Sequence, residues 1–151
     1  MDTSRCTARH HDGFTLIEMM ITLVLVATLS AMAVSMYSTS MLHSRRTDAK
    51  TALFDLAGRE ERSYSATNLY SSTPSQLGYV GAAFPIAVGS NYYTVNVQAP
   101  APAPGVAPTY TISAAAQGSQ TADVNCALFV LDQTGRQLSF NSGGAASTGC
   151  W

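Results

Sequence analysis

The chain has few charged side chains, and a long stretch near its start lacks glycine and proline. Asp, Glu, Lys and Arg make up 11% of the 151 residues, against roughly a quarter in typical soluble domains. No glycine or proline lies between Gly13 and Gly58, and residues 19–42 contain none of these four charged types. A helix this long, at about 1.5 Å per residue, exceeds the roughly 30 Å hydrocarbon core of a bilayer. We therefore expect one membrane-spanning helix over about 14–37.

Histidine is missing from the larger, later part of the chain. All three histidines, His10, His11 and His43, precede residue 64, and the only acids after Glu61 are Asp123 and Asp132. A Ser-His-Asp or Cys-His arrangement cannot be assembled there, and two acids are too few for a convincing acid/base pair or metal site. The sequence predicts no catalytic residues, no metal and no cofactor.

Basic residues are also scarce beyond the helical region. The formal net charge is −1, and Arg136 is the only Lys or Arg after Arg62. DNA binding depends on several phosphate contacts from such residues. We therefore predict no direct nucleic-acid binding. We expect the earlier cations to form a solvated or subunit-facing surface of the helix. These cations are Arg45, Arg46, Lys50, Arg59 and Arg62.

The helical pattern continues past the apolar run and becomes amphipathic. Small and apolar residues recur on one face, and Asp55 and Arg59 stand at the i, i+4 spacing of a supportive ion pair. All six prolines and nine of the eleven glycines lie at residue 74 or later. This shift predicts a boundary between one long helix over 14–63 and a globular β domain over 64–151. Residues 1–13 are rich in charge and have no periodic apolar pattern, so they are expected to form a leader.

Alternating apolar and polar residues indicate four antiparallel strands in the later part. They fall around 93–98, 110–114, 127–131 and 137–140, and Asp132 to Gly135 is a good hairpin turn between the last two. The Ala-Pro segment over 99–108 predicts a projecting loop. The fold class is therefore α+β.

The three cysteines, Cys6, Cys126 and Cys150, lie on opposite sides of the apolar run. A membrane between them leaves Cys6 in the reducing cytoplasm and the other two where a disulfide forms. A bond from Cys150 to Cys126 would anchor a Gly/Ser/Ala-rich tail that would otherwise fray.

A single acid, Glu18, interrupts the start of the apolar run, directly after Gly13-Phe14-Thr15-Leu16-Ile17. A carboxylate in hydrocarbon costs roughly 2.5–3.5 kcal/mol even on the lenient insertion scale. This leader, glycine, phenylalanine and glutamate resemble the prepilin signature of type IV pilins and related pseudopilins. Segments further along, including Ala66-Thr67-Asn68-Leu69-Tyr70 and the closing Cys150-Trp151, are similar to minor pilins of the type IVa pilus.

The resemblance implies a pilin fold, with a long N-terminal helix packed on a four-stranded antiparallel sheet. It also implies cleavage after Gly13 by the prepilin peptidase and methylation of the freed Phe14 amine. Glu18 of an incoming subunit is then expected to pair with the Phe14 amine of a neighbour in the filament, which removes the penalty of an unpaired buried acid. In the alternative interpretation, Glu18 lies at the level of the lipid headgroups, where its charge stays solvated and has no role in assembly.

A stripe of small residues, Ala27, Ala31 and Ser35, recurs at four-residue spacing and suits close helix packing. Many pilins have a glycine and a proline in this segment, whereas here Ala27 and Ser35 occupy those places. We therefore expect a more continuous helix than is usual in the family.

Two rival interpretations remain. In one, a signal peptide is cut after Ala33, in Ala31-Met32-Ala33, and releases a soluble domain. In the other, the chain is a pseudopilin of a type II secretion system, although the cysteine pair and the shortage of acids favour a minor pilin.

The favoured expectation is a structural subunit that supports pilus assembly or initiation, and through it adhesion, twitching motility or DNA uptake. Its expected partners are other pilins through their N-terminal helices, the prepilin peptidase and the inner-membrane assembly machinery. The precursor is expected in the inner membrane with its β domain in the periplasm, and the mature subunit in the extracellular pilus.

Overall fold

The structure is a computed structural model that describes residues 13–151. The chain divides into two units, the first ending at Ser38 and the second comprising Thr39–Trp151. The helix α1, Leu16–Thr67, begins in the first unit and ends in the second. Of the expected leader, only Gly13 lies within the described residues.

In the first unit, α1 consists mostly of apolar residues. Its large apolar side chains are more than half exposed in the isolated chain, including Leu16 at 79% and Tyr37 at 68%. The helix contains an 18-residue window with a mean hydropathy of 2.1, so by length and composition it is able to cross a membrane. The helical conformation continues through Ala27 and Ser35, as expected from the absence of glycine and proline.

α1 ends at Thr67, four residues beyond the predicted end near Ser63. Asn68 adopts a left-handed backbone conformation with φ of 58°, and its N–H donates to the Tyr64 carbonyl at 2.8 Å. Asparagine is the commonest substitute for glycine at this capping position. The stop signal is therefore Asn68 itself, which lies within the segment assigned from the sequence to the β domain.

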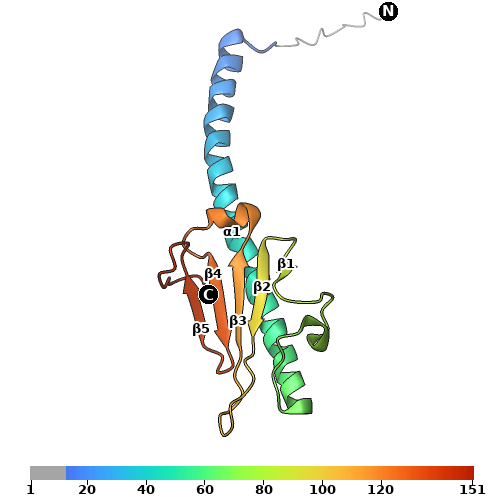
Figure 1. Cartoon of the computed structure of the whole chain (residues 1–151). Helices are drawn as coiled ribbons and strands as arrows, with labels where there is room; N and C mark the ends of the chain where they lie inside the picture. The colour runs from blue at the N-terminus through green and yellow to red at the C-terminus, as the bar shows by residue number, and fades with distance from the viewer. Residues whose placement is uncertain (1–12) are drawn as a thin grey trace, which may run out of the picture. The chain divides into compact units, whose positions relative to one another are not determined.

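The second unit contains a five-stranded antiparallel sheet in the order β1-β2-β3-β4-β5 (Figure 1). The strands are β1 Ile86–Val88, β2 Tyr93–Gln98, β3 Thr111–Ala116, β4 Leu128–Asp132 and β5 Gln137–Phe140. Two short 3-10 helices, η1 Pro74–Leu77 and η2 Gly118–Ala122, lie in the connections. The predicted α+β fold, with a long N-terminal helix and an antiparallel sheet, is confirmed, with one strand more than the four predicted.

The extra strand, β1, lies in the part of the predicted β domain before residue 93, where no strand was expected. It has only three residues, too few for a clear alternating pattern, and it pairs Ile86 with Val95 and Val88 with Tyr93. The turn that follows begins at Gly89, where a Cβ atom would lie 2.8 Å from the Asp48 Cβ of α1. Only glycine permits this close approach, so β1 is held against the helix.

The core lies between one face of the sheet and the second-unit part of α1. Ala49, Leu53 and Leu56 of the helix are fully buried. The sheet contributes alternate residues, as a half-buried strand requires. These are Tyr93, Val95 and Val97 of β2, Ile112 and Ala114 of β3, and Phe129 and Leu131 of β4.

Candidate functional site

The predicted processing and assembly residues lie at the start of the first unit. Gly13, Phe14 and Thr15 precede the helix and are exposed, with Phe14 78% exposed. Glu18 lies in the first turn of α1, and its N–H donates to the Thr15 hydroxyl at 3.3 Å. Thr15 therefore caps the helix, and a Thr-x-x-Glu sequence is the pattern of a capping box.

Two roles for Glu18 follow from this geometry. An acid in the first turn interacts favourably with the helix dipole, which is a purely local role. Its position at the entrance of a long apolar helix also suits a carboxylate that pairs with a cation from another molecule. A glutamine keeps the capping pattern but not the charge, so substitution separates the two roles.

The predicted packing stripe lies further along the same helix. Ala27 and Ala31 are exposed and stand one turn apart, so they share a face. The Ser35 side chain lies outside the described residues. The role of all three in helix packing stays a prediction.

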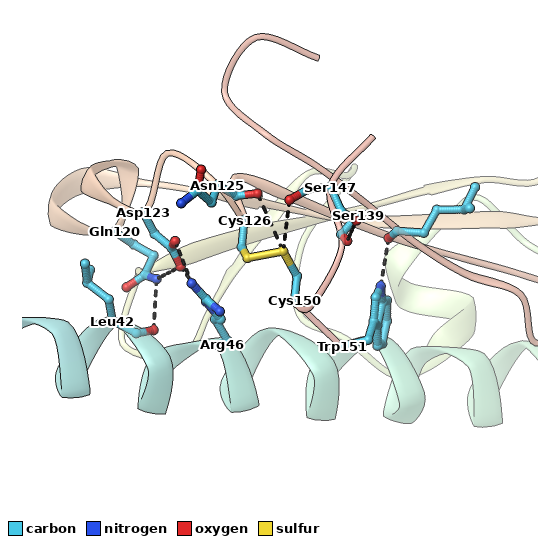
Figure 2. Close-up of a disulfide and its surroundings, with 11 residues drawn as sticks. Leu42, Arg46, Gln120, Asp123, Asn125, Cys126, Ser139, Ser147, Cys150 and Trp151 are labelled. Carbon is cyan, nitrogen blue, oxygen red and sulfur yellow. Dashed lines mark hydrogen bonds and ion pairs between the residues drawn. A yellow bond between two sulfur atoms is a disulfide. The ribbon is translucent and has the colours of Figure 1, made fainter. Parts of the chain in front are cut away.

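In the second unit, the C-terminus is fastened to the core by a disulfide and a tryptophan (Figure 2). Cys126 and Cys150 form the predicted disulfide, which closes a sequence separation of 24 residues. The Trp151 indole N–H donates to the Leu138 carbonyl at 2.9 Å. Its ring packs edge-on against Phe129 at 5.5 Å and Phe54 of α1 at 6.1 Å. The tail is therefore anchored to both the sheet and the helix.

A buried ion pair joins α1 to the segment before the disulfide. Arg46 donates to both carboxylate oxygens of Asp123, at 2.6 and 2.8 Å, and their side chains are only 11% and 5% exposed. Gln120 donates from its amide to Asp123 at 3.3 Å and to the Leu42 carbonyl at 3.2 Å. Figure 2 shows these contacts beside the disulfide. The interpretation of Arg46 as a solvated or subunit-facing cation is therefore wrong, because its side chain is buried and paired within its own chain.

Two more cations of α1 contact their own domain. Arg45 lies over the Tyr92 ring at 3.7 Å and donates to Ser119 at 3.1 Å. Arg59 forms the predicted pair with Asp55 at 2.8 Å and lies over the Tyr79 ring at 4.5 Å. Because Arg45 and Arg59 contact their own chain, less of the positive charge of α1 is available to contact another molecule.

Tyr79 forms a cluster with Asp55 and Arg59. Its hydroxyl donates to Asp55. Burial, together with this carboxylate, raises the pKa of Tyr79 to about 12. The same hydrogen bond is the main cause that lowers the pKa of Asp55. The cluster fixes the loop after η1 to the helix.

Glu60 was missed by the sequence analysis, which had no signal to distinguish it from the exposed Glu61. It is fully buried, and one of its carboxylate oxygens accepts the Ser71 N–H at 2.9 Å. The other oxygen has no hydrogen-bond partner among the described residues. Burial raises the pKa of this carboxyl, against the opposing effect of the Ser71 hydrogen bond.

Within residues 13–151, no three His, Cys, Asp or Glu side chains gather closely enough to hold a metal ion. Asp55, Glu60 and Asp123 are instead engaged in the polar contacts described above. The features that distinguish this chain are its N-terminal motif, its apolar helix and its disulfide-anchored domain.

A family model described as "Type IV minor pilin ComP, DNA uptake sequence receptor" matches residues 35–130, more than half of the chain. A model of the prokaryotic N-terminal methylation motif matches residues 8–34. The chain belongs to the type IV minor pilin family.

A solved type IV pilin from Shewanella oneidensis is also similar to this minor pilin. It is 24% identical, with a TM-score of 0.46, over 73% of this chain and 97% of that chain. No curated protein matches the minor pilin. Its family is one of structural subunits, and the methylation motif with the apolar helix indicates membrane anchoring before pilus assembly.

Proposed function

We propose that this minor pilin is cut after Gly13, inserted in the inner membrane with Thr39–Trp151 in the periplasm, and then transferred into a type IV pilus. The observation that carries the proposal is the placement of Glu18. It is the only acid of the first helical turn, and it lies four residues after the exposed Phe14 at the head of an apolar helix. A neighbouring subunit's Phe14 amine is the cation that would neutralise this carboxylate.

Processing is tested by the mass of the mature N-terminus. The proposal predicts a chain that begins at Phe14 with a methylated amine. A chain that begins at Val34 would instead support a secreted domain released by a signal peptidase. Replacing Gly13 with a bulkier residue should leave the uncut precursor in the membrane fraction, whereas Gly58→Ala provides a control that is exposed and far from the cut.

Assembly is tested by deleting the gene and measuring two outputs side by side. Loss of surface pili with normal protein secretion supports a pilus subunit. Normal pili with impaired secretion would support a type II pseudopilin instead. The Cys126–Cys150 disulfide and the minor pilin family match favour the first result.

DNA uptake is the output that the family match favours over adhesion or motility, because the matching model is described as a DNA uptake sequence receptor. We propose that this chain supports uptake through pilus assembly rather than by holding DNA itself. Six Lys or Arg residues in Thr39–Trp151 balance six Asp or Glu residues. Four of the six cations, Arg45, Arg46, Arg59 and Arg136, contact side chains of the same chain.

A mobility-shift assay with the full-length chain tests this distinction. In low salt, where electrostatic binding is strongest, we expect no saturable binding of duplex DNA. Tight, sequence-dependent binding would contradict the proposal and make the chain a DNA receptor. Transformation frequency in the deletion strain should fall together with pilus number.

A further inference from the structure

Two adjoining hollows lie where α1 ends in the second unit. The first, of about 480 Å³, lies between the last turns of α1 and the segment after it. The second, of about 360 Å³, lies between that segment and Ala99–Pro102 of the Ala-Pro loop. Figure 1 shows the end of α1 and this loop, between β2 and β3, at the same end of the sheet. Because the hollows share Leu69, Tyr70, Ser71 and Gln76, they form one surface groove, the α1-end groove.

The α1-end groove presents hydrogen-bonding groups that the described chain leaves unused. Ser71 donates its hydroxyl to the side-chain carbonyl of Gln76, which leaves the Gln76 amide NH₂ as a donor. The Ser72 and Thr73 hydroxyls have no side-chain hydrogen bond within residues 13–151. All three groups line the second hollow.

The wall that carries these groups is held in place from beneath. Buried Glu60 accepts the Ser71 N–H at 2.9 Å, and the Ser71 hydroxyl accepts the Thr73 N–H at 3.0 Å. Tyr70 stacks on Tyr64 at 4.8 Å and meets Tyr110 edge-on at 4.6 Å. A preformed wall lowers the entropy lost on binding, so even a few hydrogen bonds can give measurable affinity.

The charge of the α1-end groove restricts its ligand. None of the residues that line it carries a charge. The acids that touch its wall are Glu60 under Ser71 and Glu61, which accepts the Tyr70 hydroxyl at 3.2 Å. An anionic chain such as nucleic acid gains no ion pair from the lining and meets these carboxylates. The opposite wall, formed by Pro100, Pro102 and Pro108, is apolar and stiff.

We propose that the α1-end groove binds a neutral glycan. Such a chain combines hydroxyl groups, which match Ser72, Thr73 and Gln76, with apolar C–H faces, which match the proline wall. The Ala-Pro loop then has a function as one side of a binding site. This inference is independent of the assembly role of Glu18, which lies in the other unit of the chain.

The test uses the full-length chain in a zwitterionic detergent without a sugar headgroup, since a glycoside detergent would compete for the groove. The probes are hexasaccharides of glucose, mannose and N-acetylglucosamine. Their binding is detected by saturation-transfer NMR, and the affinity is measured by titration. A galacturonic acid hexamer and a DNA duplex are the anionic comparators. We expect at least one neutral hexasaccharide to bind saturably and more tightly than either anion.

Substitutions then place the binding in the groove. Thr73→Val and Gln76→Ala each remove one hydrogen-bonding group, and each should weaken binding of the neutral probe roughly fivefold. Gln117→Ala, at an exposed glutamine beyond the other end of β3, is the matched control and should leave affinity unchanged. Circular dichroism and an intact disulfide check the fold of every variant.

Three results would overturn the proposal. The first is that no neutral hexasaccharide binds. The second is that an anionic comparator binds more tightly than all of them. The third is that folded Thr73→Val and Gln76→Ala chains bind as the wild type does, which would place the glycan elsewhere.

Discussion

At the residue scale, Glu60 is a buried acid that has no charged partner within residues 13–151. Its pKa is raised above the usual 4.5, mainly by burial. A folded chain that holds this proton more tightly than the unfolded chain gains stability below about pH 4.5 and loses that gain as pH rises through the folded-state pKa. Glutamine accepts the same Ser71 N–H without ionising.

Glu60→Gln should therefore be more stable than the wild type near pH 7.5, by on the order of 1 kcal/mol. The difference should shrink as pH falls to about 4. Urea unfolding at several pH values measures it. Parallel stability curves for Glu60→Gln and wild type would contradict this account.

Arg46 and Arg136 give a second comparison at the residue scale, because one ion pair is buried and the other exposed. Arg46→Ala leaves Asp123, which is 5% exposed, without its cation, and should lower the free energy of unfolding by about 3 kcal/mol. Arg136 is 68% exposed and paired with Asp132. Its replacement by Ala should lower the free energy of unfolding by less than about 1 kcal/mol. Equal losses in urea unfolding would show that burial does not decide the strength of these pairs.

At the element scale, the C-terminal tail depends on the disulfide. Replacing both Cys126 and Cys150 with Ser releases a closed loop with a sequence separation of 24 residues. The free energy of unfolding should fall by about 3–4 kcal/mol in the chain-entropy model. Trp151 should also show red-shifted fluorescence as it leaves Phe54 and Phe129.

The control for this variant is Cys6→Ser, in the predicted leader, which should leave unfolding unchanged. If the double serine variant unfolds at the wild-type urea concentration, the anchor is provided by Trp151 and its hydrogen bond to Leu138 rather than by the disulfide.

The sequence was informative about elements whose signals are local. The uninterrupted α1, strands β2 to β5, the Asp132 turn and the disulfide all follow from spacing, punctuation and alternation. β1 was missed because three residues cannot establish a period, and its position depends on Gly89 contacting Asp48 of α1. The Arg46–Asp123 pair and the burial of Glu60 were missed because their partners come from folding, not from neighbouring sequence.

At the scale of the whole molecule, the chain combines an exposed apolar helix with a domain that engages most of its own charge. In Thr39–Trp151 the Lys and Arg count equals the Asp and Glu count. Glu18 is the one acid within the apolar part of α1. The central claim is that this carboxylate directs assembly through its charge, beyond any help it gives to the start of the helix.

The most direct measurement is the amount of this chain in sheared pili from strains that carry Glu18→Gln or Thr15→Ala. Glutamine keeps the capping pattern and removes the charge, whereas Thr15→Ala removes the capping hydroxyl and keeps the carboxylate. Immunoblots confirm that both variants are cut and reach the membrane. We predict that Glu18→Gln is incorporated at least about tenfold less than wild type, equivalent to roughly 1.4 kcal/mol, and that Thr15→Ala is incorporated almost normally. Normal incorporation of Glu18→Gln would contradict the account.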